Sequence, residues 1–274
     1  RALLDGKEAW NSRLAFGFRP GKGSQEAGLA LVVYTVKPLP EYEGRPIIIS
    51  NASATREQVE RAWPGRQVDV IEPRAELPEG VSIHQHLDHA FGIRALEDPA
   101  TQARALDEVR QILAKHQGQK VGVITHKSFA DQVAAEFPGL LVLNFYNHRS
   151  TNSAAKVNAW IVLGTPHPRE APVIRDTEAL YWQDPRPISP EVVFRSYPVT
   201  DVNGLTYKSP SRRTFLDPRL QEQFDQRTSL EMEQAVYRCR PLNLDAPEQG
   251  DLFDKKATGK RTSVDVYVFS TIPL

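Results

Sequence analysis

The stretch "KVGVITHKSFADQVAAEFPGLLVLNF", Lys120 to Phe145, gives the clearest indication of the fold. Residues 120–125 and 140–145 are rich in Val, Leu and Ile with little alternation, which is typical of strands covered on both faces. Between them, Phe129, Val133 and Phe137 recur at helical spacing. A strand, a helix and a second strand joined by short connections predict a β-α-β unit, whose two strands run parallel.

Similar segments lie on both sides of this unit. Strands are predicted at residues 29–36, 46–50, 68–71, 81–84, 160–164 and 264–270, and helices at 56–63, 99–116 and 220–237. They indicate an α/β fold, a parallel sheet with helices on both faces, preceded by a short partial α/β segment. The Pro- and Gly-containing stretch "PRAELPEG", residues 73–80, predicts a boundary. We therefore expect two parts, 1–77 and 78–274.

The composition excludes several classes of protein. The 34 basic and 34 acidic residues give a formal net charge of zero, which argues against binding by bulk charge but allows a local basic channel. The single cysteine, Cys239, excludes a disulfide framework within the chain. No apolar run approaches the ~18 residues of a membrane span. We expect a cytoplasmic protein with no membrane partner.

Several familiar catalytic patterns are absent from the sequence. It contains no Gly-x-x-x-x-Gly-Lys-Ser/Thr phosphate loop and no Gly-x-Ser-x-Gly elbow. The densest metal-like cluster is His84, His86 and His89. Because no second cluster completes a ligand shell, we expect a polar junction between strand and helix here, and no metal.

Two other stretches carry residues suited to binding phosphate. In "NFYNHRSTNSAAKVNAWIVLGTPHP", residues 144–168, a polar loop follows one strand and Gly164-Thr165 follows the next. Loops at the carboxyl ends of parallel strands are where α/β folds bind ligands. In "EMEQAVYRCRPL", residues 231–242, Gln234 and Arg238 share a helix face, and Arg240 precedes Pro241, which ends the helix. Arginine pairs bidentately with phosphate oxygens, so these residues could bind phosphate. Alternatively, they could form a solvated helix end that the helix dipole favours.

The order of these pieces resembles the later part of a superfamily-two helicase. "SAT" at residues 53–55 resembles motif III, and "VGVITHKSFADQV" resembles the opening of a second RecA-like lobe. "NHRSTNSAAKVNAWIVLGTP" is similar to motif V and its approach, and "QAVYRCRP" to motif VI. The resemblance covers residues 46–272 and is nearest to helicase modules of phage and plasmid primase-helicase replication proteins. In the common motif VI the second arginine follows three residues after the first, whereas Arg240 follows Arg238 by two, so the identity of the arginine finger stays open.

The resemblance implies a C-terminal helicase part that acts in replication of a mobile element. ATP and Mg²⁺ would be bound mainly outside this chain, on a first helicase lobe or a primase domain, because no phosphate loop precedes Ser53. Arg238 and Arg240 would act on the γ-phosphate, with Gln234 orienting the water or an arginine. Ser53 and Thr55 would couple the nucleotide to nucleic acid, taken to be DNA. Contacts to nucleic acid or nucleotide would come from Thr125, Lys127, His148, Arg149, Ser150, Asn152, Gly164 and Thr165.

Other interpretations stay open. The chain could be a non-catalytic helicase-like module that binds nucleic acid or bridges replication proteins, or an unrelated nucleotide-binding α/β enzyme. Thr55 could simply cap the helix that comes after it, a role compatible with coupling. In "QGDLF", the residues Gln249, Leu252 and Phe253 resemble the peptide by which replication proteins bind a sliding clamp. Leu252 and Phe253 could instead hold a polar loop against the body of the protein.

Overall fold

The computed structural model describes residues 14–19, 28–33, 55–62, 65, 67–71, 76–87, 91–147, 153–200, 204–209, 211–244 and 262–272. The chain forms two compact units, and each is made of separate segments. The first comprises residues 1–72, 168–193 and 213–226, and the second 73–167, 194–212 and 227–274. The sequence predicted one boundary, after residue 77. The structure divides the chain near that position, after residue 72, and also assigns two later segments to the first unit.

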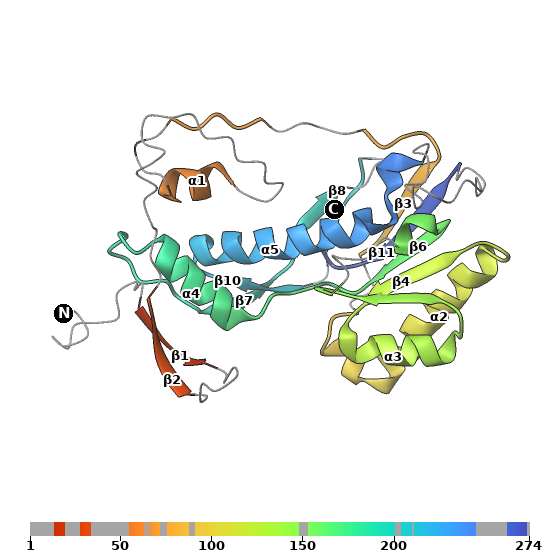
Figure 1. The fold of residues 1–274 in the computed structure, drawn as a ribbon, viewed down its shortest axis with the longest axis horizontal. Helices are drawn as coiled ribbons and strands as arrows, with labels where there is room; N and C mark the ends of the chain where they lie inside the picture. The colour runs from red at the N-terminus through yellow and green to blue at the C-terminus, as the bar shows by residue number, and fades with distance from the viewer. Residues whose placement is uncertain are drawn as a thin grey trace, which may run out of the picture. The chain divides into compact units, whose positions relative to one another are not determined.

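The second unit is built on a five-stranded sheet (Figure 1). Its strands are β3 (Val81–His86), β4 (Val121–Thr125), β5 (Leu141–Asn144), β6 (Ala159–Leu163) and β11 (Val264–Phe269). They lie in the order β3-β11-β6-β4-β5, and every neighbouring pair is parallel. The prediction of an α/β fold with a parallel sheet is therefore confirmed.

Helices cover both faces of this sheet. On one face, α2 (Pro99–Lys115) and α3 (Lys127–Glu136) pack Val109 and Phe129 against strand residues such as Val123 and Ile161. On the other face, Met232 and Ala235 of α5 (Pro218–Val236) pack with Trp160 and Val266. All five residues of β4 and all five of β6 are buried. Burial from both sides explains why these strands read as continuous apolar runs.

The strand order places a topological switch point between β4 and β6. From β4 the chain passes through α3 to β5, which lies on the side of β4 away from β6. From β6 the next strand of this sheet along the chain is β11, which lies on the side of β6 away from β4. Connections that leave two neighbouring strands in opposite directions open a crevice at their carboxyl ends, and α/β folds bind ligands there. The residues directly after β4 and β6 therefore define one candidate site.

The first unit contains the strands β1 (Leu14–Arg19) and β2 (Gly28–Val33), the helices α1 (Arg56–Ala62) and α4 (Glu170–Leu180), and the first half of α5. β1 and β2 pair antiparallel. A small core joins Val173 and Tyr181 to Ile188, Phe215 and Leu220. The sequence predicted neither β1 nor α4. The apolar pattern of α4 is short and interrupted by polar residues.

Four further strands form two small sheets. β7 (Val192–Arg195) pairs with β10 (Arg212–Phe215), and β8 (Pro198–Thr200) pairs antiparallel with β9 (Thr206–Lys208). The sequence did not predict these strands, which have three or four residues each.

The strand predicted at residues 68–71 is wrong. Those residues form neither strand nor helix, and Ile71 is 88% exposed, so a β-branched run lacks the partner strand that its sequence suggests. The strand predicted at 46–50 lies outside the described residues. Among the described helices, none combines the length and the apolar character that crossing a membrane requires.

Candidate functional site

The carboxyl ends of β4 and β6 bring four of the predicted site residues to one edge of the sheet. Thr125 is the last residue of β4, Lys127 begins α3, and Gly164 and Thr165 come directly after β6. The Thr125 hydroxyl donates to the Leu163 carbonyl at 2.9 Å. The Thr165 hydroxyl lies 3.0 Å from that of Ser270, which is the residue after β11. Both threonines are buried, and their hydroxyl groups stabilise the strand ends through these hydrogen bonds. Lys127, in contrast, is exposed.

His126 lies between two predicted residues and was missed. Its side chain is 7% exposed, its ring packs edge-on against Phe145, and Nε2 is buried without a hydrogen-bond partner among the described residues. Burial, together with the charge of His167, lowers the pKa of His126 to about 4. The imidazole is therefore neutral at pH 7. The sequence contained one signal for this residue, because His126 is a polar residue directly after an apolar strand.

Gly164 allows the close approach at this edge. Its φ of +109° lies in a region that favours glycine, and a Cβ atom there would lie 2.5 Å from the Phe91 carbonyl oxygen and 2.9 Å from His126 Nε2. The need for glycine at position 164 therefore has a steric explanation that does not depend on any ligand. Its predicted contact to nucleic acid or nucleotide stays a prediction.

The chain segment after β5 is tied to the same edge. Tyr146 has a φ of 66°, and its hydroxyl donates to the Pro166 carbonyl at 2.9 Å. Its backbone N–H donates to Oε1 of Glu231, a carboxylate of α5 that is 1% exposed. Sequence reasoning missed both residues. The burial of Glu231 depends on which strand end α5 meets, and no local sequence pattern shows this.

The predicted arginines lie toward the opposite end of the sheet. Glu231 meets the carboxyl end of β5, but four residues later the Ala235 carbonyl accepts from Nε1 of Trp160, the second residue of β6, at 2.8 Å. Along α5 the chain therefore runs from the carboxyl toward the amino ends of the strands. Arg238 lies in the 3-10 turn η4 (Tyr237–Cys239), beyond the end of the helix.

The end of α5 differs from the prediction. The α-helix ends at Val236, the turn η4 comes next, and Arg240 adopts a left-handed conformation with a φ of 50°. The Arg240 N–H donates to the Tyr237 carbonyl at 2.9 Å. The helix thus ends before Arg238, so Gln234 and Arg238 do not share one α-helical face, and the chain has already turned before Pro241.

Arg238 and Arg240 form a pair of like charges. Burial lowers the pKa of Arg238, and the charge of Arg240 lowers it further. The turn η4 contacts η3 (Ser153–Lys156), the short helix that precedes β6. The predicted loop residues His148, Arg149, Ser150 and Asn152 lie outside the described residues, but the chain that continues from them is placed beside Arg238.

The structure therefore separates the predicted residues into two groups in the second unit. Thr125, Lys127, Gly164 and Thr165 lie at the carboxyl edge of the sheet, and Arg238 and Arg240 lie toward its amino edge. Gln234 lies on α5 between these ends, partly buried. Ser53, Gln249, Leu252 and Phe253 lie outside the described residues.

Thr55 caps α1, as the alternative interpretation predicted. Its hydroxyl accepts from the Gln58 N–H at 3.2 Å, and the Gln58 side chain accepts from the Thr55 N–H at 3.3 Å. This reciprocal pair is a capping box. The cap is confirmed, and the coupling role of Ser53 and Thr55 stays a prediction.

The histidine cluster has other partners in the structure. His84 stacks on Tyr267 and His86 stacks on Phe269, across β3 and β11. The Tyr267 hydroxyl lies 2.7 Å from Lys115 Nζ and 3.0 Å from His116 Nε2. His89 lies outside the described residues, and within the described part of the chain no group of three suitable side chains could hold a metal ion.

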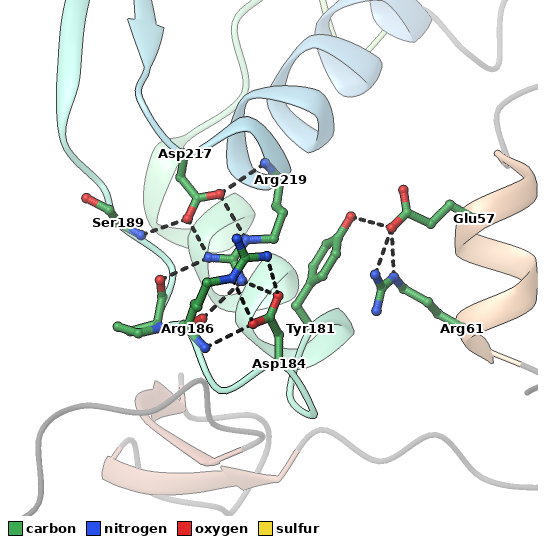
Figure 2. A network of polar contacts seen from close by, with 9 residues as sticks. Glu57, Arg61, Tyr181, Asp184, Arg186, Ser189, Asp217 and Arg219 are labelled. Carbon is green, nitrogen blue, oxygen red and sulfur yellow. Dashed lines mark hydrogen bonds and ion pairs between the residues drawn. The ribbon is translucent and has the colours of Figure 1, made fainter.

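A polar network organises the first unit (Figure 2). Arg219 is paired with Asp217 at 2.7 Å and with Asp184 at 2.8 Å, and it donates to the carbonyls of Arg186 and Pro187. Asp217 also accepts from the Ser189 N–H. Figure 2 also shows the Tyr181 hydroxyl donating to Glu57, which pairs with Arg61. The central guanidinium carbon of Arg61 lies 3.9 Å from the centroid of the Tyr181 ring. These contacts connect α1, the end of α4 and the start of α5.

No protein family model matches the chain, and neither a curated protein nor a solved structure is significantly similar to it.

Proposed function

We propose that this chain is the C-terminal part of an ATP-dependent helicase or translocase that acts on DNA in replication of a mobile element. Its second unit would be the second RecA-like motor lobe. The observation that carries the proposal is the pair Arg238 and Arg240, held beside the segment that continues from the loop of residues 148–152. In the sequence, these two stretches are the ones that resemble motifs V and VI.

The electrostatics of the pair support an anionic ligand. Two neighbouring guanidinium groups repel each other, and the pKa of Arg238 is lowered both by burial and by Arg240. An anion placed between them would offset this repulsion, and a phosphate group matches the planar fork of arginine. The γ-phosphate of ATP develops charge during hydrolysis, so arginines aimed at it accelerate the reaction.

The sequence contains no phosphate loop, so ATP and Mg²⁺ would be held outside this chain, on a first helicase lobe or a partner. Arg238 and Arg240 would complete that site, and Gln234 would orient water or an arginine. At the carboxyl edge, the hydroxyl groups of Thr125 and Thr165 are used inside the protein. The exposed Lys127 and the first turn of α3 are then the groups available to a DNA phosphate.

The test is ATP hydrolysis by the full-length protein, together with whatever partner supplies the phosphate loop, with and without single-stranded DNA. Arg238→Ala and Arg240→Ala should lower turnover roughly 10²–10⁴-fold, with far smaller changes in ATP affinity, because the arginines act mainly in the transition state. Arg195→Ala, an exposed arginine of β7, is the matched control and should retain turnover. Near wild-type turnover in both motif VI variants would rule out their assignment.

The same assay addresses the non-catalytic alternative, which the missing phosphate loop favours. A protein that binds DNA but hydrolyses no ATP in the presence of its replication partners would be a binding module. In that case Arg238→Ala should weaken DNA binding or leave it unchanged, with no turnover to lose.

A further inference from the structure

The side chain of Gln58 uses all of its hydrogen-bonding capacity. Its Nε2 donates to Oε1 of Gln223 at 2.9 Å and to Oε1 of Gln226, and its Oε1 accepts from Thr55 N–H at 3.3 Å and from Gln226 Nε2 at 3.2 Å. A glutamine amide has two donor hydrogens and two acceptor lone pairs, so none is left over. One side chain thus completes the capping box of α1 and also binds α5.

The two elements joined by Gln58 carry the residues of interest to the proposed function. α1 begins directly after residues 53–55, which resemble motif III. α5 continues without a break from Gln223 and Gln226 to Val236, two residues before Arg238. Gln223 is 6% exposed, so removing its partner would leave a buried amide oxygen unsatisfied.

The attachment of α1 includes several polar contacts. The helix has seven residues, too few to be stable alone, and its partners include Tyr181 through Glu57 and Arg61 (Figure 2). Each neutral hydrogen bond contributes only a modest net free energy, so an attachment of this kind can open and close more readily than a packed apolar core.

We infer that Gln58 is a positioning residue that latches α1 to α5, and so couples residues 53–55 to the helix that leads to Arg238. The inference rests on the proposed function, because it concerns how DNA-dependent changes at residues 53–55 reach the arginines. In this role Gln58 acts through its contacts with Gln223 and Gln226 of α5. Its role is to keep the capped start of α1 in register with Gln223 and Gln226.

Three variants separate the latch from the cap. Thr55→Ala removes the threonine half of the capping box, whereas Gln223→Met with Gln226→Met removes the latch and leaves the capping box intact. Gln58→Met removes the latch and the glutamine half of the capping box, and it keeps the bond from the backbone N–H of residue 58 to the Thr55 hydroxyl. Gln58→Glu is the conservative rescue, because the amide groups of Gln223 and Gln226 can turn over and donate to a carboxylate. Gln111→Met, at an exposed position of α2, is the matched control.

The measurement is ATP turnover of the full-length protein with its partners. It is made with and without single-stranded DNA, at one saturating concentration of ATP. We expect Gln58→Met and the Gln223/Gln226 double variant to lose stimulation by DNA roughly fivefold or more. Their KM for ATP and unstimulated turnover should stay within about twofold of wild type. Gln58→Glu and Gln111→Met should retain stimulation. A purely structural latch would instead lower the melting temperature and leave stimulation unchanged.

The outcomes distinguish the two proposals. Full stimulation in folded Gln58→Met and double-variant proteins would overturn the latch while leaving the motor function standing. A wild-type protein with no turnover under any DNA condition would overturn the motor function itself, and with it any role of the latch in that function.

Discussion

At the scale of single residues, Gly164 and His126 show how the end of a buried strand constrains the residues directly after it. Gly164 turns the chain away from β6 with a positive φ and leaves room for both Phe91 and the imidazole of His126. His126 is buried in a neutral form against Phe145. Each residue is explained by packing at the strand ends, whether or not a ligand binds at that edge.

Gly164→Ala should destabilise the protein by about 2 kcal/mol or more, because it combines a disfavoured backbone conformation with a contact of 2.5 Å to the Phe91 carbonyl. Chemical denaturation followed by circular dichroism measures the free energy of unfolding. Gly92→Ala is the control, since nothing lies within 4 Å of its added methyl group. Equal stability of the two variants would contradict the steric account of Gly164.

The pKa of His126 predicts a dependence of stability on pH. Its folded-state pKa of about 4 lies below the ordinary histidine value of 6.5, so the unfolded chain binds the proton more tightly. This contribution is present above about pH 6.5 and is lost as the pH falls toward 4, by up to roughly 3 kcal/mol. The difference in unfolding free energy between wild type and His126→Gln, measured from pH 7.5 to 4, isolates it. A difference that does not change with pH would contradict the neutral buried histidine.

At the scale of elements, α5 is held by different physical means at its two ends. At its start, Asp217 accepts from the Arg219 N–H, Pro218 occupies the first helical position, and Arg219 binds the loop of residues 184–187. In its second half, Met232 and Ala235 pack on the sheet. The first end is an ion-pair network, and the second is apolar packing.

Arg219→Met should destabilise the protein by about 2 kcal/mol or more, because Arg219 is 13% exposed and its loss leaves the buried Asp217 without its arginine, whereas Asp184 keeps Arg186. Arg186→Ala is the control. Arg186 also pairs with Asp184, but its side chain is 78% exposed, so its removal should lower the free energy of unfolding far less than Arg219→Met does. Urea denaturation compares the two, and a loss of similar size in both would contradict the distinction by burial.

At the scale of the whole molecule, the sequence alone determined the core of the second unit. Residues 120–145 predicted a β-α-β unit, and β4 and β5 form within one residue of the predicted bounds, with α3 between them. The periodicity of α2 and the apolar run of β11 were equally clear, because burial on both faces of a sheet, or on one face of a helix, leaves a local pattern. The Thr55 cap was local too, since its partner lies three residues along the chain.

Only the tertiary structure decided which of these segments meet. It assigned residues 168–193 and 213–226 to the first unit, placed Arg238 toward the other end of the sheet from Thr125, and joined Gln58 to Gln223, 165 positions away. It also left residues 68–71 without a strand partner. The physical reason is the range of the interactions. Propensity, capping and periodicity act within a few residues, whereas pairing of strands, burial of His126 and Glu231, and the grouping of side chains at a sheet edge depend on contacts between segments far apart in the sequence.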